Sequence, residues 1–207
     1  MVKFKKHIKC IFLSIIFIVS GCNDYQKLLN SEDNLAKYRA AENYYNEGEY
    51  RKANRLLEQV EPKYRGKPQA ERVVFFLADS YFNTKRYLLA AYKFEDFTKS
   101  YPKSQRVQEA LFLEAKSYYY ESPEFSLDQG DTKTALDKLQ IFINKFPQSE
   151  YLNEANVLVV ELQTKLEKKD FEVSKQYYTI RDYKSAIKSL ENFIAEYPGT
   201  SYREGAM

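Results

Sequence analysis

Apolar side chains recur with helical spacing at four places along the chain. In each place an alanine is followed four and seven residues later by an apolar residue, and eleven residues later by an aromatic one. Offsets of four, seven and eleven residues lie on one face of an α-helix. In the last three places a proline comes next and ends the helix, with a hydroxyl residue two positions on that can cap the following helix. The alanines are Ala53, Ala90, Ala135 and Ala186, and the hydroxyl residues are Ser104, Ser149 and Thr200.

A pair of adjacent aromatic residues precedes each alanine. A small residue lies three positions before each pair, so a second helix precedes the first. The order small, aromatic, alanine, aromatic, proline resembles the tetratricopeptide repeat, a helix-turn-helix of 34 residues. We therefore predict an all-α tetratricopeptide-repeat α-solenoid over 33–207, with about four repeats at 34–67, 70–104, 107–149 and 167–200. The aromatic pairs are Tyr44–Tyr45, Tyr81–Phe82, Tyr118–Tyr119 and Tyr177–Tyr178.

The spacing between repeats is uneven. The third unit contains the extra loop "ESPEFSLDQGDT", and residues 151–178 contain neither proline nor glycine. We interpret 151–178 as one long central helix, although two helices with a tight break near Lys168–Asp170 are the alternative. After Pro198 another helix would begin, and solenoids need a polar terminal cap. The expectation is therefore that the sequence is truncated before a fifth repeat.

The aromatic pairs suggest a binding surface. Adjacent helical residues point about 100° apart, so the two members cannot share a neighbour. In a tetratricopeptide repeat the first member packs inside its own repeat, while the second faces the inner wall together with the residue seven positions earlier. Exposed aromatics of this kind would form a peptide groove, but the alternative is that they pack helix against helix between repeats. The predicted groove residues are Tyr38, Tyr45, Phe75, Phe82, Phe112, Tyr119, Phe171 and Tyr178.

Charged residues lie between these aromatics on the same predicted face. They are acidic in the first two repeats, at Glu42 and Asp79, and basic in the last two, at Lys116 and Lys175. A ligand with a free carboxylate, or an acidic segment, is then expected to prefer the later half of the repeat domain.

The N-terminus has the pattern of an export signal. A basic stretch, "MVKFKKHIKC", precedes ten apolar or small residues, "IFLSIIFIVS". That run is too short to span a bilayer, which takes about 20 residues. The following "VSGC" resembles a lipobox, so we predict a signal peptide at 1–21, covalent lipid on Cys22 and an N-terminal tether at 22–32. A plain secretory signal with an incidental cysteine is the alternative.

Composition narrows the function. The formal charge of +3 becomes −1 without the four lysines of the predicted signal, which gives no support to nucleic-acid binding. The only histidine, His7, lies in that segment, as does Cys10. The predicted mature chain thus has no histidine for acid–base or zinc chemistry, no disulfide, and no glycine-rich phosphate loop. We predict a protein that is not an enzyme and has no cofactor beyond the lipid.

Two stretches resemble a known family. "SPEFSLDQGDTKTALDKLQIFINKFPQSEYLNEA" (122–155) and "FEVSKQYYTIRDYKSAIKSLENFIAEYPGTSY" (171–202) are similar to the BamD family of outer-membrane β-barrel assembly lipoproteins. The resemblance covers the mature chain, and the SP…LDQ loop is its most specific part. The family normally has five repeats.

The resemblance implies a lipid-anchored scaffold on the periplasmic face of the outer membrane. It would bind the barrel assembly subunit (BamA-like) and nascent outer-membrane proteins by their C-terminal signals. Asn23, rather than Asp, after the cysteine is consistent with export to the outer membrane. Two other functions compete: a periplasmic repeat adaptor for envelope or cell-division machinery, and an envelope enzyme using paired carboxylates.

Overall fold

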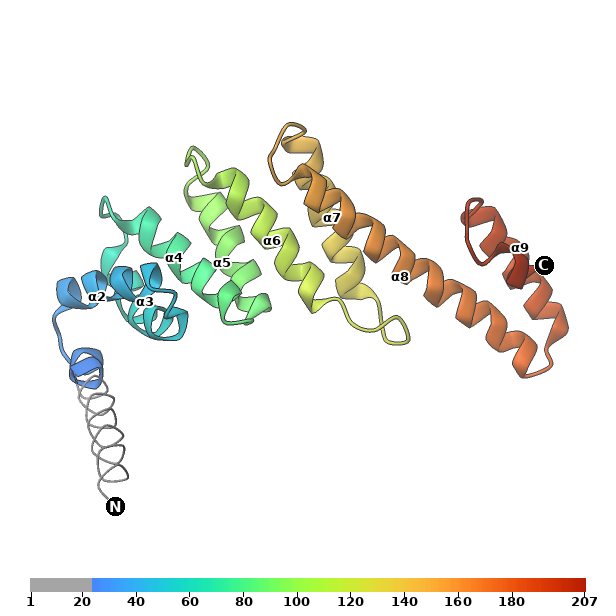
Figure 1. Cartoon of the computed structure of the whole chain (residues 1–207), viewed down its shortest axis with the longest axis horizontal. Helices are drawn as coiled ribbons and strands as arrows, with labels where there is room; N and C mark the ends of the chain where they lie inside the picture. The colour runs from blue at the N-terminus through green and yellow to red at the C-terminus, as the bar shows by residue number, and fades with distance from the viewer. Residues whose placement is uncertain (1–23) are drawn as a thin grey trace, which may run out of the picture. The chain divides into compact units, whose positions relative to one another are not determined.

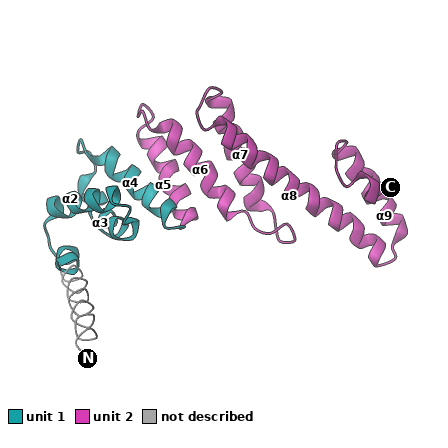
Figure 2. Cartoon of the chain, in the orientation of Figure 1, with its two compact units in different colours: residues 1–85 teal, residues 86–207 magenta. Residues whose placement is uncertain are grey.

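A computed structural model of the chain describes residues 24–207, so the predicted signal peptide and Cys22 lie outside the described residues. The described secondary structure is helical, and the prediction of an all-α, tetratricopeptide-like protein is confirmed (Figure 1). The described helices form two compact units, which divide between Lys85 and Arg86 (Figure 2). Their bounds are α2 (Asn34–Asn46), α3 (Tyr50–Tyr64), α4 (Ala70–Asn83), α5 (Tyr87–Ser100), α6 (Val107–Glu121), α7 (Gly130–Lys145), α8 (Leu152–Thr179), α9 (Tyr183–Glu196) and α10 (Arg203–Ala206).

In the first unit α2 packs on α3, and α3 packs on α4. Asp33 caps α2 by accepting hydrogen bonds from the N–H groups of Leu35 and Ala36, at 3.0 and 2.9 Å. The predicted buried face of α3 is confirmed, because Ala53, Leu57 and Val60 are fully buried. Burial of this face, at about 25 cal/mol per Å² of apolar surface, is the main stabilising contribution of the hairpin.

In the second unit the helices pack in chain order, and α8 also contacts α6. The predicted inner positions Ala90, Ala135 and Phe142 are fully buried. One ionised pair lies among these apolar residues: Lys138 of α7 donates to buried Glu114 of α6 at 2.6 Å. Burial raises the pKa of the Glu114 carboxyl, and the bond to Lys138 opposes that rise.

The long helix is confirmed as a single element. α8 runs without interruption through Lys168 and Asp170, where a break was the alternative. Its first half packs on α7, and its second half packs on α9. Near its C-terminal end a small core forms around Phe171, Phe193 and Ala206. One helix therefore serves two hairpins.

Three of the turns that join paired helices share one backbone conformation. Gly48, Lys85 and Arg181 each adopt a left-handed conformation, with φ of 76°, 63° and 66°. Each donates its N–H to the carbonyl of the second member of the preceding aromatic pair, at 2.9–3.0 Å. Each also lies five residues before a repeat alanine. A left-handed residue reverses the chain in a short turn, and it costs little at Gly48 but about 1 kcal/mol or more at a lysine or arginine.

The predicted capping hydroxyls lie slightly outside the helices. Ser104, Ser149 and Thr200 each accept a hydrogen bond from the N–H two residues later, at 3.0–3.1 Å. These N–H groups belong to the residue just before α6, α8 or α10. The hydroxyls therefore stabilise the turn that leads into each helix rather than the first helical N–H groups.

Candidate peptide-binding surface

Four of the eight predicted groove residues are part of the core. Tyr38, Phe75, Phe112 and Phe171 are buried, with Phe75 and Phe112 only 1% and 2% exposed. The prediction that they offer an accessible surface is therefore wrong. We call these four residues the inner row.

Ring contacts explain the burial of the inner row. Phe112 stacks on Tyr151 with ring centroids 4.8 Å apart and lies 5.4 Å from Phe142. Phe171 stacks on Tyr202 in the same way, at 4.7 Å. The inner-row residues lie away from the ends of their helices, and neighbouring parts of the chain cover them there. The alternative stated above, packing of helix against helix, describes this row.

The second members of the aromatic pairs behave differently, and we call Tyr45, Phe82, Tyr119 and Tyr178 the outer row. Tyr45 is half-buried: its ring stacks on Phe76 at 3.9 Å, and its hydroxyl donates to Asp79 at 2.6 Å. Phe82 is also half-buried. Both residues therefore keep part of their surface exposed to solvent in the first unit.

The outer row is also accessible in the second unit. Tyr119 is half-buried and donates its hydroxyl to Glu161 of α8. Tyr178 is 63% exposed, and its ring meets Tyr183 edge-on at 5.7 Å. The second members of the pairs are therefore accessible, whereas their predicted partners seven residues earlier are buried. The first members do not contrast with them as predicted, because only Tyr81 is buried, Tyr44 and Tyr118 are half-buried and Tyr177 is exposed.

The predicted groove charges are matched inside the chain. Glu42 pairs with Arg72 at 2.8 Å and accepts the Tyr38 hydroxyl. Asp79 accepts the Tyr45 hydroxyl, as described above. Lys116 pairs with Glu154 at 2.6 Å, and Lys175 pairs with Glu172 at 3.1 Å. Ion pairs within the chain therefore offset the charges of Glu42, Lys116 and Lys175, which weakens the predicted division into an acidic half and a basic half.

Two of the phenols are held in the neutral form. The hydrogen bond to Glu161, with burial, raises the pKa of Tyr119 to about 12. Burial, with the hydrogen bond to Glu42, raises the pKa of Tyr38 to about 12. Both hydroxyls are donors to a carboxylate, and ionisation would place two negative charges side by side.

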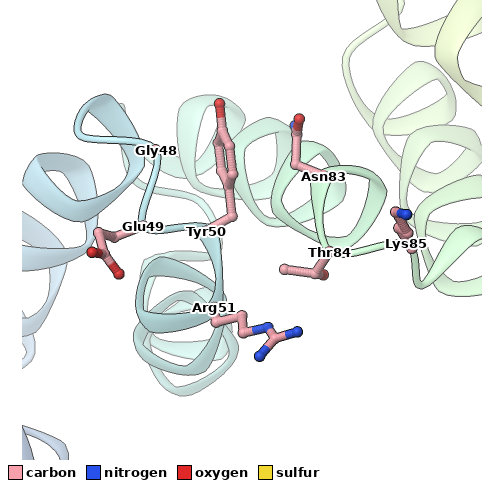
Figure 3. A pocket seen from close by; sticks show the side chains of 7 residues that line it. All are labelled: Gly48, Glu49, Tyr50, Arg51, Asn83, Thr84 and Lys85. Atoms are coloured by element: carbon pink, nitrogen blue, oxygen red, sulfur yellow. The ribbon is translucent and has the colours of Figure 1, made fainter.

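A cleft of about 310 Å³ opens between two turns of the first unit, the turn after α2 and the turn after α4 (Figure 3). Its lining includes the cationic side chains of Arg51 and Lys85, the amide of Asn83 and the carboxylate of Glu49, which pairs with Lys52 at 3.4 Å. Tyr50, which also lines the cleft, meets the outer-row residue Tyr45 edge-on at 5.6 Å. A polar cleft lined by two cations and one carboxylate therefore lies next to a half-buried aromatic ring.

Of the exposed apolar residues around the turn between α8 and α9, the sequence analysis singled out Tyr177 and Tyr178 and missed the others. Ile180 is 64% exposed, and several neighbours in the sequence are also exposed. Ile180 occupies a turn, where a polar residue is usual, and this was a signal in the sequence. We call these residues the α8–α9 patch: Val173, Tyr177, Tyr178, Ile180, Tyr183 and Ile187.

The loop between α6 and α7, which carries the most specific sequence resemblance, has a defined structure. Buried Gln129 donates to the carbonyls of Glu124 and Leu127, at 2.9 and 3.0 Å, and accepts from Thr132 at 2.8 Å. Lys165 of α8 donates to the Ser122 hydroxyl at 2.7 Å. The SP…LDQ motif is thus a folded structure that is fixed to α8.

Two other kinds of feature, a membrane-spanning helix and a metal centre, are absent from residues 24–207. Within that range no helix is both long enough and apolar enough to cross a membrane. Within the same range, no group of three or more His, Cys, Asp or Glu side chains is arranged to hold a metal ion.

Comparison with known proteins identifies the family. Residues 30–207 match the family YfiO, described as outer membrane lipoprotein. The chain belongs to this family. The match includes every helix from α2 to α10 and the SP…LDQ loop.

Curated relatives of this YfiO chain carry one name, outer membrane protein assembly factor BamD. The protein from Helicobacter pylori is 26% identical over 164 residues, which are 70% of this chain and 69% of the relative. The protein from Pasteurella multocida is 21% identical, over 89% of this chain and 74% of the relative. The protein from Rickettsia prowazekii is 23% identical, over 94% and 78%. The resemblance to the BamD family is therefore confirmed at low sequence identity.

Proposed function

We propose that the chain is a non-catalytic scaffold lipoprotein of the machinery that assembles β-barrel proteins in the outer membrane. The observation that carries this proposal is the family match over residues 30–207, with relatives named as outer membrane protein assembly factors. The scaffold would bind the barrel assembly subunit and the C-terminal signals of nascent outer-membrane proteins. Helical hairpins that present part-exposed rings suit binding of a polypeptide segment.

Affinity purification from solubilised outer membrane tests the assembly role. The native protein, carrying a small C-terminal tag, is expected to recover a barrel-forming assembly subunit. A tagged outer-membrane lipoprotein of another family is the control for non-specific recovery. Repeated purification without any such subunit would contradict the proposal.

The proposal places the chain on the periplasmic face of the outer membrane through lipid on Cys22. Two or more acyl chains give stable anchoring, because each buried methylene contributes about 0.8 kcal/mol. Intact mass spectrometry of the membrane-extracted protein is expected to show acyl groups that are absent from a Cys22→Ser variant. An unmodified Cys22 in the native protein would refute the anchor.

We further propose that a client signal contacts the outer row and places its terminal carboxylate in the cleft beside Tyr45. The cleft supports this assignment because Arg51 and Lys85 are among its lining side chains. Lys116 and Lys175 are less suitable, since each is already paired with a glutamate. The terminal carboxylate of the client would then bind the first unit, and not the later repeats that the sequence analysis predicted.

Charge-reversal variants distinguish the two possible binding sites of the client carboxylate, the cleft of the first unit and the later repeats. Arg51→Glu with Lys85→Glu is expected to weaken the binding of a labelled signal peptide in fluorescence anisotropy by about 10-fold or more, on the scale of a charge-assisted hydrogen bond. Lys116→Glu with Lys175→Glu is the matched control and should change the Kd less. If only the control variant weakens binding, the carboxylate lies in the later repeats as the sequence first suggested.

A further inference from the structure

The chain is already folded onto its first repeat within three residues of Cys22. Residues 24–29 are helical and pack on the α2–α3 hairpin. The Tyr25 hydroxyl donates to the Lys52 carbonyl of α3 at 3.0 Å, and its ring meets Tyr44 edge-on at 5.4 Å. We call residues 24–31 the docked segment.

A buried lysine holds the other end of the docked segment. Lys37 of α2 donates to the Leu29 carbonyl at 3.0 Å and to Gln59 Oε1 at 2.6 Å. Both Lys37 and Leu29 are buried. Gln59 belongs to α3, so only the bond to Leu29 would be lost if the segment detached, and a buried ammonium group that loses a hydrogen-bond partner is costly. Most of the predicted tether at 22–32 is therefore fixed to the repeat domain.

This docking shortens the reach of an anchor at Cys22. Tyr25 lies three positions after Cys22, a separation that spans at most about 11 Å when extended. If the chain were free as far as Asp33, the cap of α2, the same calculation would give about 36–40 Å. Docking thus reduces the possible distance between the anchor and the hairpin about three-fold.

We infer that the docked segment holds the α2–α3 hairpin against the phospholipid surface, an inference that rests on the proposed lipid on Cys22. The partner is the headgroup layer of the membrane that holds the acyl chains. Arg55 is exposed on α3 three residues after Lys52, whose carbonyl accepts the Tyr25 hydroxyl, and its positive charge favours contact with lipid phosphates. The acid Glu58 lies on the same helix and accepts a hydrogen bond from the Tyr81 hydroxyl. The first repeat is consequently the part of the scaffold with the least freedom to leave the membrane.

Energy transfer between the hairpin and labelled lipid measures this distance. The lipidated chain with Arg39→Cys carries a donor dye at an exposed position of α2. No other free thiol remains once Cys10 is removed with the predicted signal peptide and Cys22 is lipidated. Vesicles of phosphatidylethanolamine and phosphatidylglycerol carry acceptor dye on their headgroups. We expect strong transfer, and a loss of transfer when ten Gly/Ser residues are inserted between Asn23 and Asp24. Such a linker adds about 17 Å of root-mean-square length and leaves every contact of the docked segment intact.

Two further variants separate docking from linker length. Lys37→Met with Tyr25→Phe should lower transfer as the inserted linker does, while Gln26→Ala, on an exposed position of the docked segment, should not. Circular dichroism confirms that each variant is folded. If the insertion leaves transfer unchanged while the protein still floats with vesicles, the inference is wrong and the anchor stands. If mass spectrometry finds no acyl chain and flotation is lost, the proposed anchor is wrong and the inference fails with it.

Discussion

The inner and outer rows show how differently two residues on one helical face can be used. Phe112 and Tyr119 stand seven residues apart on α6, which is two turns of one face. Phe112 is 2% exposed between Phe142 and Tyr151, whereas Tyr119 is half-buried and bonded to Glu161 at its tip. Helical periodicity tells in which direction around the helix axis a side chain points. Whether that side chain is buried also depends on how far along the helix it lies. Residues of the outer row stand in or near the last turn, where neighbouring helices cover less of the face.

The largest loss of stability should follow from replacing an inner-row aromatic residue by alanine. Phe112→Ala is expected to lower the free energy of unfolding by about 3–5 kcal/mol, because it removes a fully packed ring and leaves a cavity. Denaturant unfolding followed by circular dichroism measures this loss. Phe112→Leu, which retains most of the apolar volume, is the control and should cost clearly less. A loss below about 1 kcal/mol for the alanine variant would mean that the inner row is not core.

Alkaline pH should destabilise the fold through one phenol of each row. Tyr38 and Tyr119 have folded pKa values raised to about 12, whereas an unfolded tyrosine titrates near about 10. The stability that they contribute is therefore fully present below pH of about 10 and is lost as pH rises toward about 12. Thermal unfolding across this range is expected to show a falling Tm. The double variant Tyr38→Phe with Tyr119→Phe should have a shallower fall, and an unchanged slope would contradict the assignment.

A smaller effect is expected from the hydroxyl of an outer-row residue. Tyr119→Phe removes the hydrogen bond to Glu161 but retains the ring, so unfolding should become easier by about 0.5–1.5 kcal/mol. Glu161 is exposed and can bond to water instead, which favours the lower end. Glu161→Gln keeps an acceptor and is the matched comparison. Equal or greater stability of Tyr119→Phe would show that the bond contributes nothing.

The smallest effect on stability should come from the most exposed ring. Tyr178→Ala is expected to change the free energy of unfolding by less than about 0.5 kcal/mol, because the side chain is 63% exposed. If the outer row binds clients, the same variant should weaken signal-peptide binding in fluorescence anisotropy. Loss of stability without loss of binding would reverse the comparison between the two rows.

The sequence was sufficient for the helices because local rules decide them. The offsets from Ala53, Ala90, Ala135 and Ala186 predicted the buried faces, and the absence of proline and glycine predicted the single helix α8. Proline and the left-handed turns then set where the helices end.

The binding surface was predicted only in part, because exposure depends on tertiary neighbours. Nothing local in the sequence shows that Tyr151 and Tyr202 cover the rings of Phe112 and Phe171. The salt bridge of Lys116 also depends on Glu154 of another helix, whose position only the folded structure gives. That of Lys175 with Glu172, three residues earlier on α8, could have been predicted from helical spacing. The docked segment was not foreseen, since its key donor, Lys37, reads as a surface lysine in a helix.

The continuity of α8 has a mechanical consequence. At 1.5 Å per residue its 28 residues form a rod of about 42 Å, with one hairpin attached to each half. No break interrupts α8. A force applied to α9 is therefore transmitted through α8 to α7 and to the α6–α7 loop, which is hydrogen-bonded to Lys165. A load applied at the C-terminal end of the second unit is thereby transmitted along its length instead of being absorbed where it arrives.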